Sequence, residues 1–297
     1  MSVVTHREAG TLAVALRMGR ARLAAAATTT PGLDAEVLLR YALGIDRTQL
    51  FARLRDHISP GDLAVYNTLL AQRARDVPIA YLIGEREFMG LSFEVDPAVL
   101  VPRPETEILV EWAIAWLSDR DRATVVDVGT GSGAIAISIA ATMRPNWPGR
   151  VLAADISPRA VAIATRNQMR LDSDCRVTLV QGSLLSWVGA PIDLVIANLP
   201  YLRPDQIASN PTLAAEPRMA LDGGADGLDL IRNLLDDAPR VVAPGGAIGL
   251  EIDPGQRDVV VKQAQRTFPT SDVRVLRDLA GLDRHVIVQT MASYPGA

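Results

Sequence analysis

The residues best suited to chemistry lie in three short segments of this 297-residue chain. The first satisfies the G-x-G-x-x-G/A pattern, with Ala134 as its last position, between a candidate strand and a candidate helix. Glycines permit a tight turn there and let the backbone pass close to a ligand. The turn indicates a nucleotide-like ligand, although a glycine-rich connection without a ligand is the alternative. Its residues are Gly129, Thr130, Gly131, Ser132 and Gly133.

The second segment is Asp155, which ends the next candidate strand about 20 residues beyond the glycine turn. A carboxylate at that strand tip can accept hydrogen bonds from both ribose hydroxyls of an adenosine. The alternative is that Asp155 caps the following helix, a role that Ser157 could fill instead. Together, the turn and the carboxylate predict an adenosyl ligand, which could be NAD or S-adenosylmethionine.

The third segment is the tetrapeptide Asn198-Leu199-Pro200-Tyr201, which follows the candidate strand at residues 193–197. It offers an amide side chain, a backbone carbonyl held by the following proline, and an aromatic face. That combination suits a planar amide or amino group, whose N–H donors it can accept, and it favours S-adenosylmethionine over NAD. A simple Asn-x-Pro turn is the alternative.

These segments must be positioned by the elements around them. After residue 122, strand and helix patterns alternate, which is typical of a doubly wound, mainly parallel α/β sheet with ligands at the carboxyl ends of its strands. Residues 1–76 carry helical patterns and predict a small helical domain, and alternation over residues 77–104 predicts a β-hairpin linker. Residues 105–297 form the predicted catalytic domain. Its seven candidate strands are Thr124–Val128, Val151–Ala154, Val177–Val180, Leu194–Ala197, Ala247–Ile252, Val273–Leu276 and His285–Gln289.

Composition limits the classes of function. The net charge is −4, and residues 1–104 hold 12 basic and 11 acidic side chains, which disfavours stable nucleic-acid binding. No apolar run approaches the ~20 residues that a membrane span needs. Cys175 is the only cysteine, so no intrachain disulfide can form and a reducing, cytoplasmic location is expected. No cluster has metal-ligand spacing.

The chain resembles the protein-(glutamine-N5) methyltransferase family, PrmC/HemK, which modifies peptide chain release factors. The tetrapeptide is similar to that family's Asn-Pro-Pro-Tyr motif, and the domain order also fits. The similarity extends over nearly the whole chain, through segments 81–84 (YLIG), 101–107 (VPRPETE), 216–218 (EPR) and 221–228 (LDGGADGL).

The resemblance implies a class I, Rossmann-like methyltransferase that moves a methyl group from S-adenosylmethionine to the glutamine of a Gly-Gly-Gln motif. It makes Asn198, Leu199, Pro200 and Tyr201 the catalytic segment, and it adds Ser183, Leu184 and Asn198 to the cofactor site. The sequence departs from the family at Leu199, which stands where proline is common, and at Ser183, which stands where an acid is common.

Release factors are therefore the expected partners of a monomeric enzyme. An adenine-N6 DNA or RNA methyltransferase shares the tetrapeptide logic, and a glutamine methyltransferase of a ribosomal protein is a sibling hypothesis. A non-catalytic binding module that kept the fold is a further alternative.

Overall fold

The structure is a computed structural model that describes residues 10–144, 147–172, 176–189 and 191–292. Contacts between Cα atoms divide the chain into two compact units. The first comprises Met1–Gly84 with Pro211–Ala215, and the second comprises Glu85–Asn210 with Glu216–Ala297. The assignment of recognition, linker and catalytic roles to residues 1–76, 77–104 and 105–297 stays a prediction.

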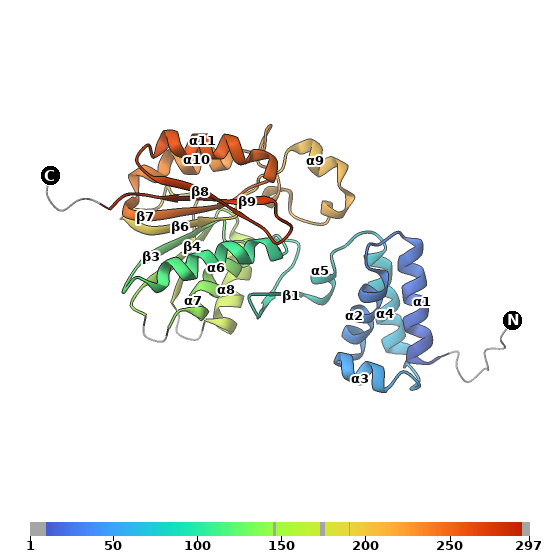
Figure 1. Ribbon diagram of the computed structural model, residues 1–297. Helices are drawn as coiled ribbons and strands as arrows, with labels where there is room; N and C mark the ends of the chain where they lie inside the picture. The colour runs from blue at the N-terminus through green and yellow to red at the C-terminus, as the bar shows by residue number, and fades with distance from the viewer. Residues whose placement is uncertain (1–9, 145–146, 173–175, 190, 293–297) are drawn as a thin grey trace. The chain divides into compact units, whose positions relative to one another are not determined.

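In the described part of the first unit, five α-helices pack together, and their buried residues include Leu23, Leu38 and Tyr66. Figure 1 labels these helices. Gly19 allows two of these helices to pack closely, because a Cβ there would lie only 1.9 Å from the Tyr66 hydroxyl. Buried Asp34 pairs with Arg73 at 2.7 Å. The helices are α1 (Leu12–Ala25), α2 (Pro31–Leu43), α3 (Arg47–Ala52), α4 (Pro60–Arg73) and α5 (Ile79–Ile83).

The second unit begins with the predicted hairpin, whose strands β1 (Glu85–Phe88) and β2 (Leu91–Glu94) pair antiparallel. Met89 and Gly90 form the turn with φ of 51° and 73°, as a two-residue hairpin turn with the right-handed twist requires. Helix α6 (Pro104–Ser118) follows, with proline in its first turn and Glu107 accepting the Met89 N–H at 2.8 Å.

The sheet has seven strands in the order β5-β4-β3-β6-β7-β9-β8. Strands β3 to β7 run parallel, while β9 is antiparallel to both β7 and β8. The prediction of a mainly parallel seven-stranded sheet is therefore confirmed. The strands are β3 (Thr124–Val128), β4 (Arg150–Asp155), β5 (Val177–Gln181), β6 (Ile192–Ala197), β7 (Val242–Glu251), β8 (Asp272–Arg277) and β9 (Asp283–Gln289).

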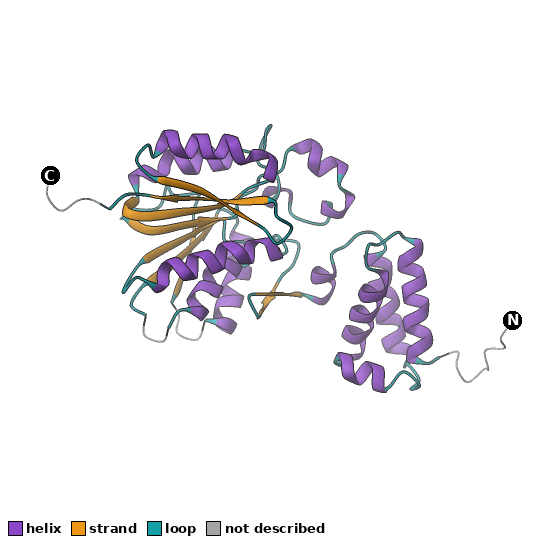
Figure 2. Ribbon diagram, viewed as in Figure 1, coloured by secondary structure: helices purple, strands orange, loops and turns teal. Residues whose placement is uncertain are grey.

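Helices cover both faces of the sheet (Figure 2). Successive strand residues point to opposite faces, so Val125 packs in one core cluster and Val126 in the other. One cluster gathers under α6 and α7 (Ala134–Thr142), with α8 (Pro158–Leu171) beside α7. The other cluster lies under α10 (Asp229–Asp237) and α11 (Arg257–Thr267).

Several short elements were not predicted. Helices α3 and α5, the six-residue α9 (Pro204–Ser209) and short 3₁₀ turns such as Arg218–Ala220 lack the length that makes an apolar period visible. Cys175 lies outside the described residues. Among the residues the structure describes, no helix combines the length and the apolar character that crossing a membrane requires.

Candidate functional site

The glycine turn connects β3 to α7 at the carboxyl end of the sheet. Gly129, Gly131 and Gly133 all have positive φ, at 75°, 56° and 83°. Gly133 is favoured by its positive φ, and a Cβ there would also lie 2.8 Å from Ile137 Cδ1, a side-chain end that would have to shift. A Cβ at Gly131 would meet nothing within 4 Å. Gly131 therefore leaves open space where a ligand can approach the backbone.

Asp155 ends β4 beside this turn. Its Oδ2 accepts the Gly131 N–H at 2.9 Å, and its Oδ1 accepts the Ser157 N–H at 2.8 Å. Burial raises the pKa of Asp155 above its ordinary value, and the two N–H donors oppose that rise. Ser157 caps α8 by accepting from Ala160 N, so Asp155 is not the helix cap. The carboxylate is held rigidly and still has lone pairs for a ligand.

Asp127 supports the turn from beneath and was missing from the predicted site. It is buried in β3, and its Oδ2 accepts from Thr130 Oγ1 at 2.6 Å and from Ala136 N at 3.2 Å. Burial raises the pKa of Asp127 to about 7. The signal in the sequence is an acid within an otherwise apolar strand segment, because charged residues are rarely fully buried without a partner.

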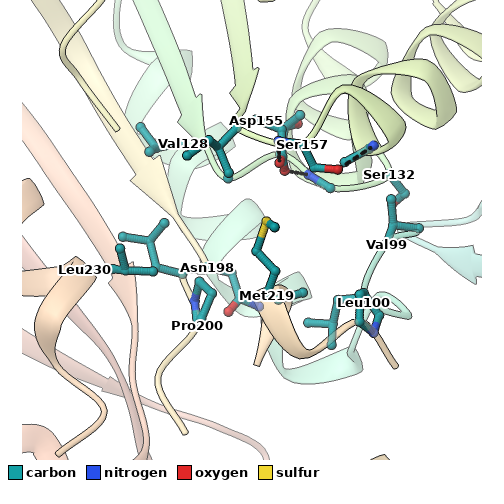
Figure 3. Close-up of a pocket in the computed structure, with 18 of the residues that line it drawn as sticks. Val99, Leu100, Val128, Ser132, Asp155, Ser157, Asn198, Pro200, Met219 and Leu230 are labelled. Atoms are coloured by element: carbon teal, nitrogen blue, oxygen red, sulfur yellow. Dashed lines mark hydrogen bonds between the residues drawn. The ribbon is translucent and has the colours of Figure 1, made fainter. Parts of the chain in front are cut away.

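A cavity of about 820 Å³ opens over the turn, within the range typical of ligand pockets. Asp155 and Ser157 lie on one side of it, and Asn198 and Pro200 lie on another (Figure 3). Met219 reaches from a 3₁₀ turn into the space between these two sides. The cavity is therefore bordered by both the predicted adenosyl site and the predicted acceptor site.

Most of the predicted site residues line this cavity. They are Gly129, Thr130, Gly131, Ser132, Asp155, Ser183, Leu184, Asn198, Leu199 and Pro200. Gly133 and Tyr201 are not among the lining residues. Gly133 is instead the N-cap residue of α7.

Asn198 follows β6 directly, which brings it beside the glycine turn because β6 pairs with β3. Its Nδ2 donates to Thr106 Oγ1 at 3.0 Å, so its Oδ1 is the amide atom that can accept from a ligand. Leu199 is buried, and a Cβ on Gly129 would come within 3.1 Å of Leu199 Cδ2. The leucine side chain therefore packs against the first glycine of the turn.

The hydroxyl and the backbone carbonyl of Tyr201 both have partners within the protein. Its hydroxyl donates to Glu251 Oε1 at 3.2 Å, and burial raises its pKa. Its backbone carbonyl accepts from Gln256 Nε2 at 2.8 Å. The hydroxyl is therefore anchored at the end of β7, and the packing of the Tyr201 ring on a flat acceptor group stays a prediction.

Arg103 and Glu216 join two segments that are far apart in the sequence. The Arg103 guanidinium pairs with Glu216, whose other oxygen accepts the Val101 N–H at 3.3 Å. The Glu216 side chain is only 2% exposed. The pair fixes the segment leading into α6 to the segment before Met219, and both segments border the cavity.

Asn167 on α8 is a second support that the sequence did not reveal. It is fully buried, and its Nδ2 donates to the Ser132 carbonyl and to the Glu94 carbonyl, both at 2.9 Å. Its Oδ1 accepts the Glu94 N–H at 2.7 Å. One side chain thus ties the glycine turn to the hairpin.

Within the described ranges, no three His, Cys, Asp or Glu side chains form a metal site.

The chain is similar to known proteins in both its sequence and its fold. Residues 14–84 match the family model described as PrmC N-terminal domain, and residues 125–212 match the model described as Methyltransferase domain. The fold is also similar to the hMettl16 catalytic domain, solved in complex with a MAT2A 3'UTR hairpin, at a TM-score of 0.54 and 15% identity. That similarity covers 77% of this chain and 83% of the other, and it concerns the fold alone.

Two relatives match over nearly their whole length. The release factor glutamine methyltransferase of Moorella thermoacetica is 42% identical over 276 residues, which cover 92% of this chain and 96% of that protein. The release factor glutamine methyltransferase of Geobacter sulfurreducens is 38% identical over 282 residues, covering 94% and 96%. The chain is therefore a methyltransferase that belongs to the release factor glutamine methyltransferase family.

Proposed function

We propose that this enzyme methylates the side-chain amide nitrogen of the glutamine in the Gly-Gly-Gln motif of peptide chain release factors. The methyl donor is S-adenosylmethionine. The observation that carries the proposal is the orientation of Asn198, which directs an amide oxygen toward a cavity that also contains the glycine turn and Asp155. The substrate assignment is supported by family membership.

The residues present fit S-adenosylmethionine. Asp155 can accept from the ribose hydroxyls, and the open space above Gly131 admits the ligand close to the backbone. Ser183 and Leu184 line the same cavity and would border the adenine. When bound, S-adenosylmethionine supplies an electrophilic methyl group on a sulfonium.

The acceptor side must hold a poor nucleophile. The lone pair of a neutral amide nitrogen is delocalised into its carbonyl, so alignment is the main help the protein can give. Asn198 Oδ1 and the Leu199 carbonyl would each accept one hydrogen of the substrate NH₂ group. Alignment of this kind contributes about 7–11 kcal/mol, and each preorganised acceptor about 3 kcal/mol.

The same two acceptors favour the positive charge that develops on nitrogen as the new bond forms. The methylated nitrogen is acidic and releases its proton readily, so no general base is needed before attack. Consistent with this, neither His57 nor His285 is among the residues that line the cavity.

The substrate class is tested by offering a release factor, a ribosomal protein and DNA side by side with labelled S-adenosylmethionine. We expect label in the release factor. Label only in DNA would show an adenine methyltransferase, and label only in the ribosomal protein would move the activity to the sibling substrate. Either result would overturn the proposal.

The role of Asn198 is tested by Asn198→Ala. We expect kcat to fall at least about 100-fold, the scale for losing one preorganised group, while the dissociation constant of the cofactor stays close to that of the wild type. Steady-state kinetics and calorimetric titration measure the two quantities. A collapse of cofactor affinity with normal turnover of the bound complex would contradict this role.

A further inference from the structure

A row of buried polar groups adjoins Asn198, and its first member, Thr106, also borders the cavity. Asn198 Nδ2 donates to Thr106 Oγ1 at 3.0 Å, and Thr106 Oγ1 donates to Glu251 Oε2 at 2.6 Å. The other oxygen of Glu251 accepts from the Tyr201 hydroxyl at 3.2 Å. The proposed methyl transfer uses neither Thr106 nor Glu251, so their arrangement needs another explanation.

The fold brings these residues together from three elements. Thr106 lies in the first turn of α6, and Glu251 is the last residue of β7. Strands β6 and β7 are parallel neighbours, with Ala197 opposite Leu250, so Glu251 and Asn198 follow at the same edge. Thr106 is 4% exposed and Glu251 is 1% exposed. Water therefore cannot replace a lost partner at low cost.

The direction of each hydrogen bond follows from what each group can donate. A carboxylate oxygen only accepts, so the proton between Thr106 and Glu251 belongs to the Thr106 hydroxyl. A hydroxyl has one proton, which leaves Thr106 Oγ1 as an acceptor toward Asn198. The Asn198 amide must therefore turn its NH₂ group toward Thr106 and its Oδ1 the other way.

The opposite orientation of the Asn198 amide is disfavoured both at Thr106 and at the substrate. Asn198 Oδ1 would then face the lone pairs of Thr106 Oγ1, and the NH₂ group would face the donors of the substrate. An unpaired buried polar group is costly, so the threonine selects one of two nearly isosteric orientations.

We infer that Thr106, held by Glu251, is a positioning residue that sets the amide orientation of Asn198 and so makes the site accept a substrate NH₂ group. The inference rests on the proposed function, because it gives Asn198 Oδ1 the role of acceptor. Glu251 acts through Thr106: it accepts the Thr106 hydroxyl proton, which leaves Thr106 Oγ1 as an acceptor for the Asn198 NH₂ group.

His285 stands next to this row without joining it. The residue is fully buried on β9, opposite Glu251 in the sheet register. Its Nε2 lies 3.7 Å from Glu251 Oε2, beyond hydrogen-bond distance. The orientation of Asn198 therefore depends on the threonine hydroxyl and not on the imidazole.

The test compares Thr106→Val, which keeps the shape of the side chain and removes the hydroxyl, with Thr106→Ser, which keeps the hydroxyl. We expect Thr106→Val to lower kcat about 10- to 100-fold, somewhat less than the loss of a preorganised group itself. The cofactor dissociation constant should change less than about threefold. Thr106→Ser should retain kcat within about fivefold of wild type. Retention by serine and loss by valine would not arise if Thr106 only filled space.

The same substitution in an Asn198→Ala background shows whether Thr106 acts through Asn198. We expect no further loss of kcat in Asn198→Ala/Thr106→Val, because contacting residues in one network are not additive. Losses that multiply would overturn the inference, as would a Thr106→Val enzyme with normal kcat. If Thr106→Val does not fold, Thr106→Ala takes its place in the same cycle, with the same expectations.

The proposed role of Asn198 and the inferred role of Thr106 are tested separately by these variants. Normal kcat in Asn198→Ala alone would overturn the proposed role of Asn198, and the inference with it. A damaged Asn198→Ala enzyme together with a normal Thr106→Val enzyme would overturn only the inference.

Discussion

Replacing Asp155 with asparagine tests the adenosyl site with little change of shape. In the structure, both carboxylate oxygens accept backbone N–H groups, from Gly131 at 2.9 Å and from Ser157 at 2.8 Å. An asparagine has one acceptor atom, so one of the two N–H groups must face an NH₂ donor. The substitution therefore disturbs the turn and also removes an acceptor from the ribose.

The expected magnitudes follow from these contacts. A hydrogen bond to a charged group contributes about 1.5–3 kcal/mol, so losing one ribose acceptor should raise the cofactor dissociation constant about 10- to 150-fold. The free energy of unfolding should change by less than the free energy of cofactor binding. The lost Gly131 or Ser157 bond is partly offset because a neutral amide escapes the burial penalty that raises the pKa of Asp155.

Calorimetric titration with S-adenosylhomocysteine measures this affinity, and urea unfolding measures the stability. Asp193→Asn is the matched control. Asp193 accepts the Thr124 N–H at 2.7 Å near the start of β6, and it does not line the cavity. The control should keep normal affinity. A folded Asp155→Asn protein whose dissociation constant stays within about twofold of wild type would remove Asp155 from the ribose site.

Two further predictions concern the glycine turn and the acid beneath it. Gly131→Ala costs about 1–2 kcal/mol of strain at positive φ and places a methyl group in the ligand space, so cofactor affinity should fall at least about tenfold. Gly90→Ala, also at positive φ but outside the cavity, should leave affinity normal in the same titration, and equal losses would contradict the account. Burial raises the pKa of Asp127 to about 7, so the folded protein keeps this proton at pH values where the unfolded chain has lost it. Asp127 therefore makes the free energy of unfolding of the wild type fall as pH rises from about 4 to 7, by at most about 1.4 kcal/mol per pH unit. Urea unfolding of Asp127→Asn across that range should lack this slope, and identical pH profiles would show that the Asp127 pKa is not raised.

The long, strongly patterned elements could be predicted from the sequence. Residues 124–128 and 285–289 carry enough consecutive apolar side chains to indicate buried strands, and Gly90 between alternating residues indicates a hairpin. The short helices α3 and α5 could not be predicted, because five or six residues do not establish a helical period. Their formation depends on packing within the first unit.

The sequence predicts cavity-lining residues where they are close together in the chain, and it does not predict contacts between residues that are far apart. The turn, Asp155 and Asn198 follow from local spacing and from strand ends. Thr106 and Glu251 meet across 145 positions of the chain, and Arg103 and Glu216 meet across 113. No local pattern marks such pairs, because the tertiary fold brings their separate segments together. The contact of the Tyr201 hydroxyl with Glu251 has no local pattern for the same reason, since Glu251 lies on the neighbouring strand.

The central claim is that the methyl group reaches a glutamine side chain of a release factor. The most direct measurement is peptide mapping by mass spectrometry of a release factor after incubation with this enzyme and S-adenosylmethionine. The account predicts one added methyl group on the glutamine of the Gly-Gly-Gln motif, and no addition when that glutamine is replaced. A methyl group on any other residue would contradict this result. So would a release factor whose motif stays unmodified after incubation with an enzyme preparation that binds the cofactor.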